Sequence, residues 1–384
     1  MPAEDHPEIR EAVRALCARF DGSYWRELDR KRAYPTEFVN ALTEAGYLAV
    51  LVPERYGGSG LGVGAAAAIL EEIHRSGGNG AACHAQMYIM GTLLRHGSEA
   101  QREKYLPGIA KGELRLQAFG VTEPTSGSDT LSLRTTAVRD GADYVVNGQK
   151  VWTSRAEHSD LMLLLARTAP REEAAGRTEG LSVFLVDIRS SVGKGMTIRP
   201  IPTMINHATT EVFFSDLRVP GENLVGEEGK GFRYILDSLN AERVLIGAEC
   251  IGDARWFIAK ARDYACERDL FGGPIGRNQG VQFPIARVYA RTEAADLMVR
   301  RAAALYDAEE PCGAEANMAK LLASEASWAA ADVCLQTHGG FGFAEEYDIE
   351  RKFRETRLYQ IAPVSTNLIL AYLGEHVLGM PRSY

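Results

Sequence analysis

The sequence lacks the features that mark several classes of protein. Its longest small-apolar stretches, 61–70 and 161–166, are far shorter than the roughly 18–20 residues of a membrane-spanning helix. The six cysteines form no Cys-x-x-Cys pair, and the eight histidines show no zinc-binding spacing, so we predict reduced thiols and no metal site. The net charge, 43 − 51 = −8, argues against nucleic-acid binding. The acidic first residues carry no signal or transit pattern, which predicts a cytoplasmic protein without a membrane span.

The chain has 384 residues, of which 46% are hydrophobic and 24% charged, as expected for two or three globular domains. Apolar residues recur at helical spacing over 1–117, as at Ile9, Val13 and Leu16. From 118 the apolar period shortens to two, and after 226 long Ala-rich amphipathic segments return. We therefore predict an α+β protein with three domains: an N-terminal all-α domain (1–117), a middle β-barrel domain (118–225) and a C-terminal four-helix bundle (226–384). This order excludes a doubly wound nucleotide-binding fold.

Two local patterns give further expectations. The segments 138–140, 144–146 and 149–152 alternate in polarity, and Asn147-Gly148 between them predicts a hairpin turn. The glycine clusters at 57–62 and 226–231 lack the spacing of phosphate-binding loops and are interpreted as turns. The glycines of 337–343 follow a long helix instead of a strand, and they either end that helix or allow a ligand close to the backbone.

The stretch AFGVTEPTSGSDT (118–130) has a different character. A strand-like start leads into a Glu-Pro turn and then Ser-Gly-Ser-Asp, where backbone amides and hydroxyls could meet an anionic or heterocyclic ligand. It resembles the flavin-binding signature of the acyl-CoA dehydrogenase family. Four further motifs follow in the family's order: NGQKVWTS (147–154), ERDLFGGPIGRNQ (267–279), QTHGGFGF (336–343) and RLYQIAPVSTN (357–367). The resemblance covers nearly the whole chain.

The resemblance implies FAD held between the β-domain and the C-terminal bundle, with a neighbouring subunit of a homotetramer (a dimer of dimers) completing the adenine end. It places the isoalloxazine ring beside Phe119, Val121, Thr122, Trp152 and Ser154. It assigns the pyrophosphate and adenine of a partner's FAD to Arg268 and Phe271, with Gln279 in the same motif. It assigns the adenosine side to Gln336, Gly339 and Gly340, and the last cofactor contacts to Ser365, Asn367 and Ser128. Without the motifs, Trp152 would be interpreted as a barrel aromatic and Arg268 as part of a surface ion pair.

The catalytic base is where this sequence departs from most of the family. Removing the α-proton of an acyl thioester needs a carboxylate, and most relatives carry it as Glu at the position that Pro363 occupies here. Proline cannot act as a base, and it lacks the N–H that in relatives donates to the thioester oxygen. A ribityl hydroxyl acting alone, another donor, or slower turnover would each account for that loss.

A smaller subgroup, which includes the isovaleryl-CoA and long-chain acyl-CoA dehydrogenases, carries the glutamate on a bundle helix directly before an arginine. SLNAERVLIG has this pattern at Glu242 and Arg243. The alternative is a solvated helix carboxylate, but with proline at 363 we expect Glu242 to be the base. Arg243 would then orient the CoA arm, with Leu239, Asn240 and Ser128 as substrate-binding neighbours.

The sequence therefore predicts an FAD-dependent acyl-CoA dehydrogenase that makes a trans-2-enoyl-CoA and passes electrons to an electron-transfer flavoprotein. Two rivals keep the fold: a flavin-dependent oxidase or monooxygenase, and a non-catalytic flavoprotein subunit. The acyl chain is not defined, although the segment 84–94 should line its pocket by family position, and Ala362 beside Pro363 suggests room for a branched group.

Overall fold

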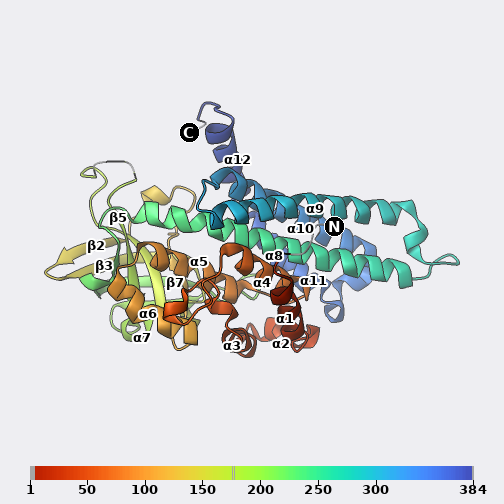
Figure 1. Cartoon of the computed structure of the whole chain (residues 1–384), viewed down its shortest axis with the longest axis horizontal. Helices are drawn as coiled ribbons and strands as arrows, with labels where there is room; N and C mark the ends of the chain where they lie inside the picture. Colours follow the sequence, from red (N-terminus) through yellow and green to blue (C-terminus); the bar gives the residue numbers. More distant parts are fainter. Residues whose placement is uncertain (1–4, 175, 177, 383–384) are drawn as a thin grey trace. The chain divides into compact units, whose positions relative to one another are not determined.

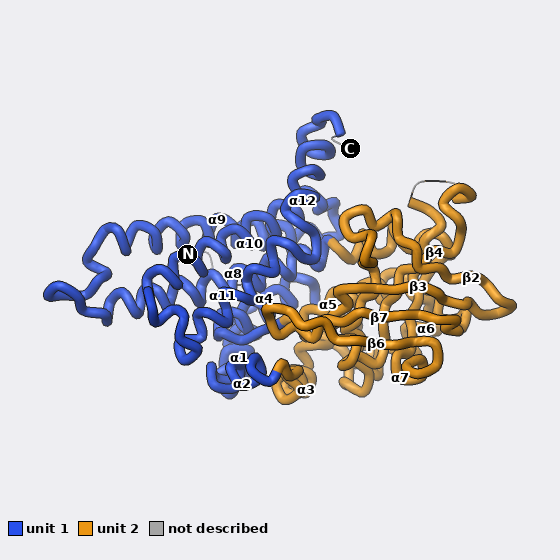
Figure 2. The backbone as a smooth tube through the Cα atoms, turned by 180° about the vertical axis from the view of Figure 1, so that it is seen from behind, with its two compact units in different colours: residues 1–31, 61–80, 240–384 blue, residues 32–60, 81–239 orange. Residues whose placement is uncertain are grey.

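The computed structural model describes residues 5–174, 176 and 178–382. The chain divides into two compact units (Figure 2). Unit 1 comprises Met1–Lys31, Leu61–Gly80 and Asn240–Tyr384, and unit 2 comprises Arg32–Gly60 and Ala81–Leu239. Each unit is thus built from segments distant in sequence, and the division between residues 239 and 240 falls inside one long helix, α8 (Gly231–Glu267).

Unit 2 is built on one mixed sheet of eight strands (Figure 1). Its strands run in the order β6-β7-β3-β2-β4-β5-β8, and β1 lies off this path, paired in parallel with β4. The other ladders are antiparallel except for the short β2–β4 pairing. The strand bounds are β1 Leu116–Gly120, β2 Thr136–Asp140, β3 Asp143–Ser154, β4 Leu161–Arg167, β5 Leu181–Asp187, β6 Met196–Pro200, β7 Thr209–Pro220 and β8 Leu224–Val225.

Both faces of the central strands are buried. Alternate residues of β4 point into two different clusters: Leu161, Leu163 and Leu165 into one, Met162 and Leu164 into the other. The second cluster receives side chains from β1 through β7, so the sheet curves around it, although its hydrogen-bonded ladder is open between the end strands β6 and β8 in the described residues. Burial on both faces explains why β4 and β5 are continuous apolar runs in the sequence.

The predicted Asn-Gly hairpin is wrong. The chain reverses earlier, between β2 and β3, where Gly141 takes a positive φ of 64°. Asn147 and Gly148 lie inside β3, where the register with β7 shifts. The Asn147 side chain is used there to exchange hydrogen bonds with Asp216 at 3.0 and 2.8 Å. An Asn-Gly pair therefore serves a bulge in a long strand here, a role that polarity alternation does not distinguish from a turn.

The helices of unit 2 are α3 (Thr36–Glu44), α5 (Ala81–His96), α6 (Glu99–Lys111) and the short α7 (Ile188–Ser191). Residues of α5 and α6 belong to the cluster that contains Leu161, Leu163 and Leu165. Ser98 and Gln101 form a capping box at the start of α6, and Gly112 ends the helix in the left-handed region. These local signals fix the helix bounds, and Leu106 and Ile109 then pack beside α5 residues such as Ile89 and Leu93.

Unit 1 is helical in its described residues. Its helices are α1 (Pro7–Cys17), α2 (Gly22–Lys31), α4 (Val63–Arg75), most of α8, α9 (Gln279–Asp307), α10 (Gly313–His338), α11 (Ile349–Arg357) and α12 (Thr366–Tyr372). One core cluster draws residues from α8, α9, α10 and α11, among them Phe257, Val288, Cys334 and Ile349, which confirms the expected helical bundle. No helix of the described chain combines the length and apolar character that crossing a membrane requires.

Candidate functional site

The first expected cofactor segment of unit 2 follows the end of a buried strand. Phe119 is the penultimate residue of β1, and Val121 and Thr122 continue from it, all three partly buried. The backbone N–H of Val151 donates to the carbonyl of Thr122 at 2.9 Å. This bond places the Phe119–Thr122 segment beside Trp152 and Ser154 on β3, so the structure brings these five predicted residues together within one unit.

A buried ion pair supports this segment, and the sequence analysis missed it. Lys150 Nζ donates to the Val121 carbonyl at 3.0 Å and to a carboxylate oxygen of Glu123 at 2.9 Å, and both side chains are almost fully buried. The Glu123 carboxylate also accepts from the backbone N–H groups of Arg134 and Thr135 at 2.6 and 2.8 Å. The only sequence signal is a lysine on the inward phase of a strand, two residues from Trp152.

The two charges shift each other's titration. Burial lowers the pKa of Lys150 to about 8, against the opposing pull of Glu123. Burial alone would raise the pKa of Glu123, but the charge of Lys150 and the hydrogen bonds to the carboxylate outweigh it and lower that pKa below its ordinary value. Both groups are therefore charged near pH 7, and the ammonium holds the loop backbone in place.

Trp152 has a strained and exposed geometry. Its φ is +60°, rare for a bulky residue, and 58% of its surface is exposed. A register shift between β3 and β7 at Lys150–Thr153 accounts for the outward turn of the ring, while Thr153 points inward. An exposed indole held in a costly conformation marks a place where a flat ring could stack. Ser154 follows, partly buried.

Ser128 lies apart from these residues, exposed in the turn after Glu123. The turn is held by Ser126 Oγ, which donates to the carbonyl of Asp129 at 2.5 Å. Leu239 is the remaining predicted residue of unit 2 and is partly buried on α8. Neither residue makes a polar contact with Phe119, Val121, Thr122, Trp152 or Ser154 in the part of the chain that the structure describes, so their roles stay predictions.

In unit 1, α8 presents Glu242 and Arg243. The Glu242 side chain is buried, with 4% of the residue exposed. Arg243 Nη1 donates to Asn240 Oδ1 at 2.9 Å, whereas its Nε is buried with no hydrogen-bond partner among the described residues. Burial lowers the pKa of Arg243, with Glu242 opposing, but a guanidinium stays charged at working pH. A buried cationic donor with an unused N–H is suited to an acceptor supplied by a ligand.

The loop after α8 presents Arg268 and Phe271. A bond from Leu270 N to Gly273 O at 2.9 Å closes a tight turn, at whose tip Phe271 takes a φ of 54° and is fully exposed. The Arg268 guanidinium lies 5.9 Å from the centre of the Phe341 ring. The structure therefore brings Arg268 to the segment after α10. Gln279, at the start of α9, is exposed.

The segment after α10 is open. Gln336, Gly339 and Gly340 are exposed. A Cβ built at Gly339 or Gly340 meets nothing within 4 Å, so nothing in the described chain crowds these glycines. A backbone this accessible can lie close to a ligand.

The last predicted segment precedes α12. Ser365 caps that helix by accepting from Leu368 N at 3.4 Å, and Asn367 is exposed in its first turn. Pro363 is exposed and contributes neither a carboxylate nor an N–H donor. Lys320 of α10 donates to the carbonyl of Val364 at 2.6 Å, a contact that the sequence analysis did not anticipate.

Each unit, taken by itself, has residues that fit one part of a flavin dinucleotide. Unit 2 offers an exposed indole, a hydroxyl at Ser154 and a rigid strand end, which suit an isoalloxazine ring. Unit 1 offers an arginine near uncrowded glycines, which suits a phosphate-bearing adenosine half. The predicted residues of unit 2 are Phe119, Val121, Thr122, Ser128, Trp152, Ser154 and Leu239, and the others belong to unit 1.

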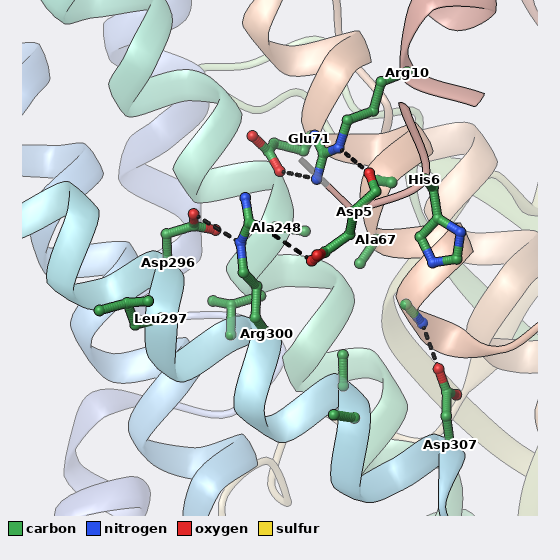
Figure 3. A pocket seen from close by; sticks show the side chains of 15 residues that line it. Asp5, His6, Arg10, Ala67, Glu71, Ala248, Asp296, Leu297, Arg300 and Asp307 are labelled. Atoms are coloured by element: carbon green, nitrogen blue, oxygen red, sulfur yellow. Dashed lines mark hydrogen bonds and ion pairs between the residues drawn. The ribbon is translucent and has the colours of Figure 1, made fainter. Parts of the chain in front are cut away.

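Unit 1 also has a cavity of about 390 Å³ formed by α1, α4, α8, α9 and the residues before α1 (Figure 3). Its charged side chains pair with one another. Arg300 bridges Asp5 and Asp296 at 3.0 Å each, and Arg10 pairs with Glu71 at 2.8 Å. None of the predicted site residues lines it. We therefore interpret it as an internal ion-pair cluster and not as the substrate site.

Three family models match the chain: the N-terminal domain of acyl-CoA dehydrogenases over residues 3–113, the middle domain over 118–217 and the C-terminal domain over 229–378. Acyl-CoA dehydrogenase FadE12 of Mycobacterium tuberculosis (strain ATCC 25618 / H37Rv) is 34% identical over 100% of this chain and 98% of its own. The cyclohex-1-ene-1-carbonyl-CoA dehydrogenase of Syntrophus aciditrophicus (strain SB) is 35% identical over 98% and 90%.

Solved structures agree. A glutaryl-coenzyme A dehydrogenase in complex with glutaryl-CoA has a TM-score of 0.91 at 31% identity and covers 100% of this chain and 98% of its own. The prolyl acyl carrier protein oxidase AnaB has a TM-score of 0.91 at 26% identity, covering 98% and 100%. The three-domain fold and the FAD cofactor expected from the motifs are confirmed. The chain belongs to the acyl-CoA dehydrogenase family of FAD-dependent oxidoreductases.

Proposed function

We propose that this enzyme dehydrogenates an acyl-CoA thioester to the trans-2-enoyl-CoA, with Glu242 as the base that removes the α-proton. The proposal rests on which residues this chain has at the two positions where the family places its catalytic carboxylate. Position 363 is an exposed proline, whereas Glu242 is buried on α8 directly before Arg243. A buried carboxylate is shielded from water and can take a proton from carbon during turnover.

The neighbouring side chains support the same assignment. Arg243 keeps an unused buried N–H, and Asn240 fixes its other end, so the guanidinium is oriented before a ligand arrives. We assign Arg243, Asn240, Leu239 and Ser128 to the CoA thioester. The segments that hold FAD are Phe119–Thr122, Ser128, Trp152–Ser154, Arg268, Phe271, Gln279, Gln336, Gly339, Gly340, Ser365 and Asn367. FAD held by these residues would supply the acceptor for the β-hydride.

The test is anaerobic flavin bleaching. Purified FAD-bound enzyme is mixed with straight, branched and ring-bearing acyl-CoAs, and the flavin absorbance is followed. We expect one class to bleach the flavin, and Glu242→Gln to slow bleaching by about 10²–10⁴-fold while FAD stays bound. Asp237→Asn is the matched control, because it changes a half-exposed carboxylate earlier on α8 that pairs with His96. A Glu242→Gln enzyme that is reduced at the wild-type rate would show that another group is the base.

An oxidase is the second candidate, and the likeness to AnaB, a protein named as an oxidase of a carrier-bound substrate, is what favours considering it. The two candidates differ in how the reduced enzyme meets oxygen. Rapid reoxidation by dissolved oxygen during turnover supports an oxidase, and slow reoxidation supports transfer to an electron-transfer flavoprotein. If FAD is bound and neither acyl-CoA nor acyl carrier protein substrates reduce it, the chain is a non-catalytic flavoprotein subunit.

We further propose a homotetramer, with domains 1–117, 118–225 and 226–384, in the cytoplasm. Phe271 is fully exposed at a loop tip, and Phe283 and Leu297 are exposed along α9, which suits burial against a second copy. The six cysteines form no disulfide bond in the described residues, which suits a reducing compartment. Light scattering on the purified protein tests the assembly, and Phe271→Ser should weaken both association and FAD binding.

A further inference from the structure

Lys320 is a buried lysine that the proposed reaction does not use. It lies on α10 with no exposed surface, and its Nζ donates to the carbonyl of Val364 at 2.6 Å. No carboxylate of the described residues forms an ion pair with it within 4 Å. Burying an ammonium group is costly unless it is paired, so a lysine kept at such a position invites a functional explanation.

The carbonyl that Lys320 holds belongs to a short segment of the proposed site. Pro363 and Ser365 flank Val364, and Ser365 is both the cap of α12 and a proposed flavin contact. The other hydrogen bonds of this part of the chain are local. Leu368 N donates to Ser365 Oγ at 3.4 Å, and Thr366 Oγ1 donates to the carbonyl of Gln360 at 3.2 Å. The Lys320 hydrogen bond therefore joins the Pro363–Ser365 segment to α10.

Lys320 also lies within electrostatic range of α8. Burial lowers its pKa to about 8, while the neighbouring Cys250 and Glu242 side chains favour its protonated form and Arg243 disfavours it. Cys312, before α10, and Tyr372, at the end of α12, act on the neighbouring Arg243. Among the described residues, Glu242 is the one carboxylate that acts on both Lys320 and Arg243. The cation at 320 therefore acts on Glu242 from the bundle side.

We propose that Lys320 is a positioning residue for the dehydrogenation, holding the Pro363–Ser365 segment against α10 and favouring the carboxylate form of Glu242 through its positive charge. The proposal rests on the proposed role of Glu242 as the base. A base must be deprotonated before substrate binds, so a nearby cation extends the enzyme's working range toward acid pH. The same ammonium group therefore both contacts the Pro363–Ser365 segment and acts on the charge of Glu242.

Lys320→Met tests the proposal, because methionine nearly conserves the volume and removes the charge. The rate of anaerobic flavin reduction at saturating acyl-CoA is measured from pH 5.5 to 9.5. We expect the acid limb to move up by about one pH unit, giving about 10-fold slower reduction near pH 6. The two rates should converge above pH 9, where the wild-type amine is uncharged. A purely structural role would lower the rate by the same factor at every pH.

Three further variants serve as controls for the Lys320→Met experiment. Lys320→Arg keeps the charge and should restore the wild-type profile. Asn317→Ala removes another buried polar side chain of α10, bonded only to the carbonyl of Gly313, and should leave the profile unmoved. Lys320→Gln removes the charge but keeps a donor, and replaces the methionine variant if that variant loses FAD. If both neutral variants lose FAD while Lys320→Arg folds, the lysine serves folding alone and the proposal is overturned.

A neutral variant whose profile superimposes on the wild type, or is lowered evenly, also overturns the proposal. This result is separable from failure of the proposed function. If the Glu242→Gln enzyme is still reduced at the normal rate, Glu242 is not the base, whatever the Lys320 variants show. If Glu242→Gln is inactive but the pH profile of Lys320→Met is unshifted, only the proposed role of Lys320 is contradicted.

Discussion

The segments proposed to hold FAD are built differently in the two units. In unit 2 the proposed segment follows the end of β1 and is fixed by a backbone hydrogen bond from Val151 to Thr122 and by a buried ion pair. In unit 1 the corresponding segments are turns around Arg268, Gly340 and Pro363, largely exposed. Strand ends hold groups rigidly, whereas exposed turns gain order from what they bind. Unit 2 therefore presents a preformed surface, and unit 1 depends more on the ligand.

In each unit a buried lysine donates to a proposed cofactor segment, and the two lysines differ in their carboxylate partners. Lys150 and Lys320 are both fully buried, both donate to a backbone carbonyl of the proposed segment, and burial lowers both pKa values to about 8. Lys150 has a carboxylate at 2.9 Å, and Lys320 has none within 4 Å among the described residues. The charge of Lys150 is largely balanced by the adjacent carboxylate, so Lys150 mainly stabilises the fold. The charge of Lys320 has no adjacent carboxylate and can act on more distant groups.

Breaking the paired lysine should have the largest effect on stability. Lys150→Met strands the Glu123 carboxylate in the interior, which costs about 3–5 kcal/mol in the free energy of unfolding. FAD content should fall as well, because the Val121 carbonyl loses its donor. Denaturant unfolding and the flavin-to-protein absorbance ratio measure the two effects.

The control is the double variant Glu123→Gln/Lys150→Met, which removes both charges and should recover a large part of the lost stability. Lys320→Met should lose much less than Lys150→Met, since no carboxylate is stranded. Equal losses at the two lysines would break the comparison between a paired and an unpaired cation.

The second-largest effect should be a pH dependence of stability at alkaline pH, caused by Lys320. The pKa of Lys320 falls from 10.5 in the unfolded chain to about 8 when folded. Between these values the unfolded chain binds a proton that the folded chain has lost, so this group's contribution to stability rises with pH, by about 3 kcal/mol in total, and is lost as pH falls through 8. The difference in unfolding free energy, wild type minus Lys320→Met, should therefore grow between pH 7.5 and 10. A constant difference would mean that the buried amine does not titrate there.

Much of this arrangement was predictable from sequence, and the misses share one cause. Helical periodicity located the long helices α8, α9 and α10, and ordered motifs identified the family and its FAD cofactor, because both signals are local. The Asn147-Gly148 turn was wrong because its outcome depends on Asp216, which lies far along the chain. Lys150 and Lys320 were missed for the same reason: a lysine's burial and its partner carbonyl are set by packing between distant elements, which periodicity does not encode.

Substitution of one glycine in each unit should affect stability less than substitution of Lys150. A Cβ at Gly148 would lie 2.5 Å from Thr135 Oγ1 and 2.7 Å from Thr135 Cα, and the residue has a φ of 145°. Thr135 directly precedes β2, and its N–H is bonded to the buried Glu123 carboxylate, so its backbone is held in place. Gly148→Ala should therefore cost about 1–3 kcal/mol of unfolding free energy, measured by denaturant. A variant as stable as the wild type would mean that the backbone around Thr135 in unit 2 moves more easily than its hydrogen bonds imply.

Gly340 is the matched position in unit 1, and its substitution should have the smallest effect on folding. A Cβ there meets nothing within 4 Å, and no positive φ is required, so Gly340→Ala should change the unfolding free energy by less than about 0.5 kcal/mol in the FAD-free protein. FAD affinity is a separate matter. If the adenosine half lies against this backbone, the added methyl group displaces it and raises the Kd for FAD by about 10-fold, measured by flavin fluorescence on the apoprotein. An unchanged Kd would remove Gly340 from the cofactor site. A weakened Kd with unchanged stability would mark unit 1 as the half whose order comes from the ligand, in contrast to Gly148, where folding itself is affected.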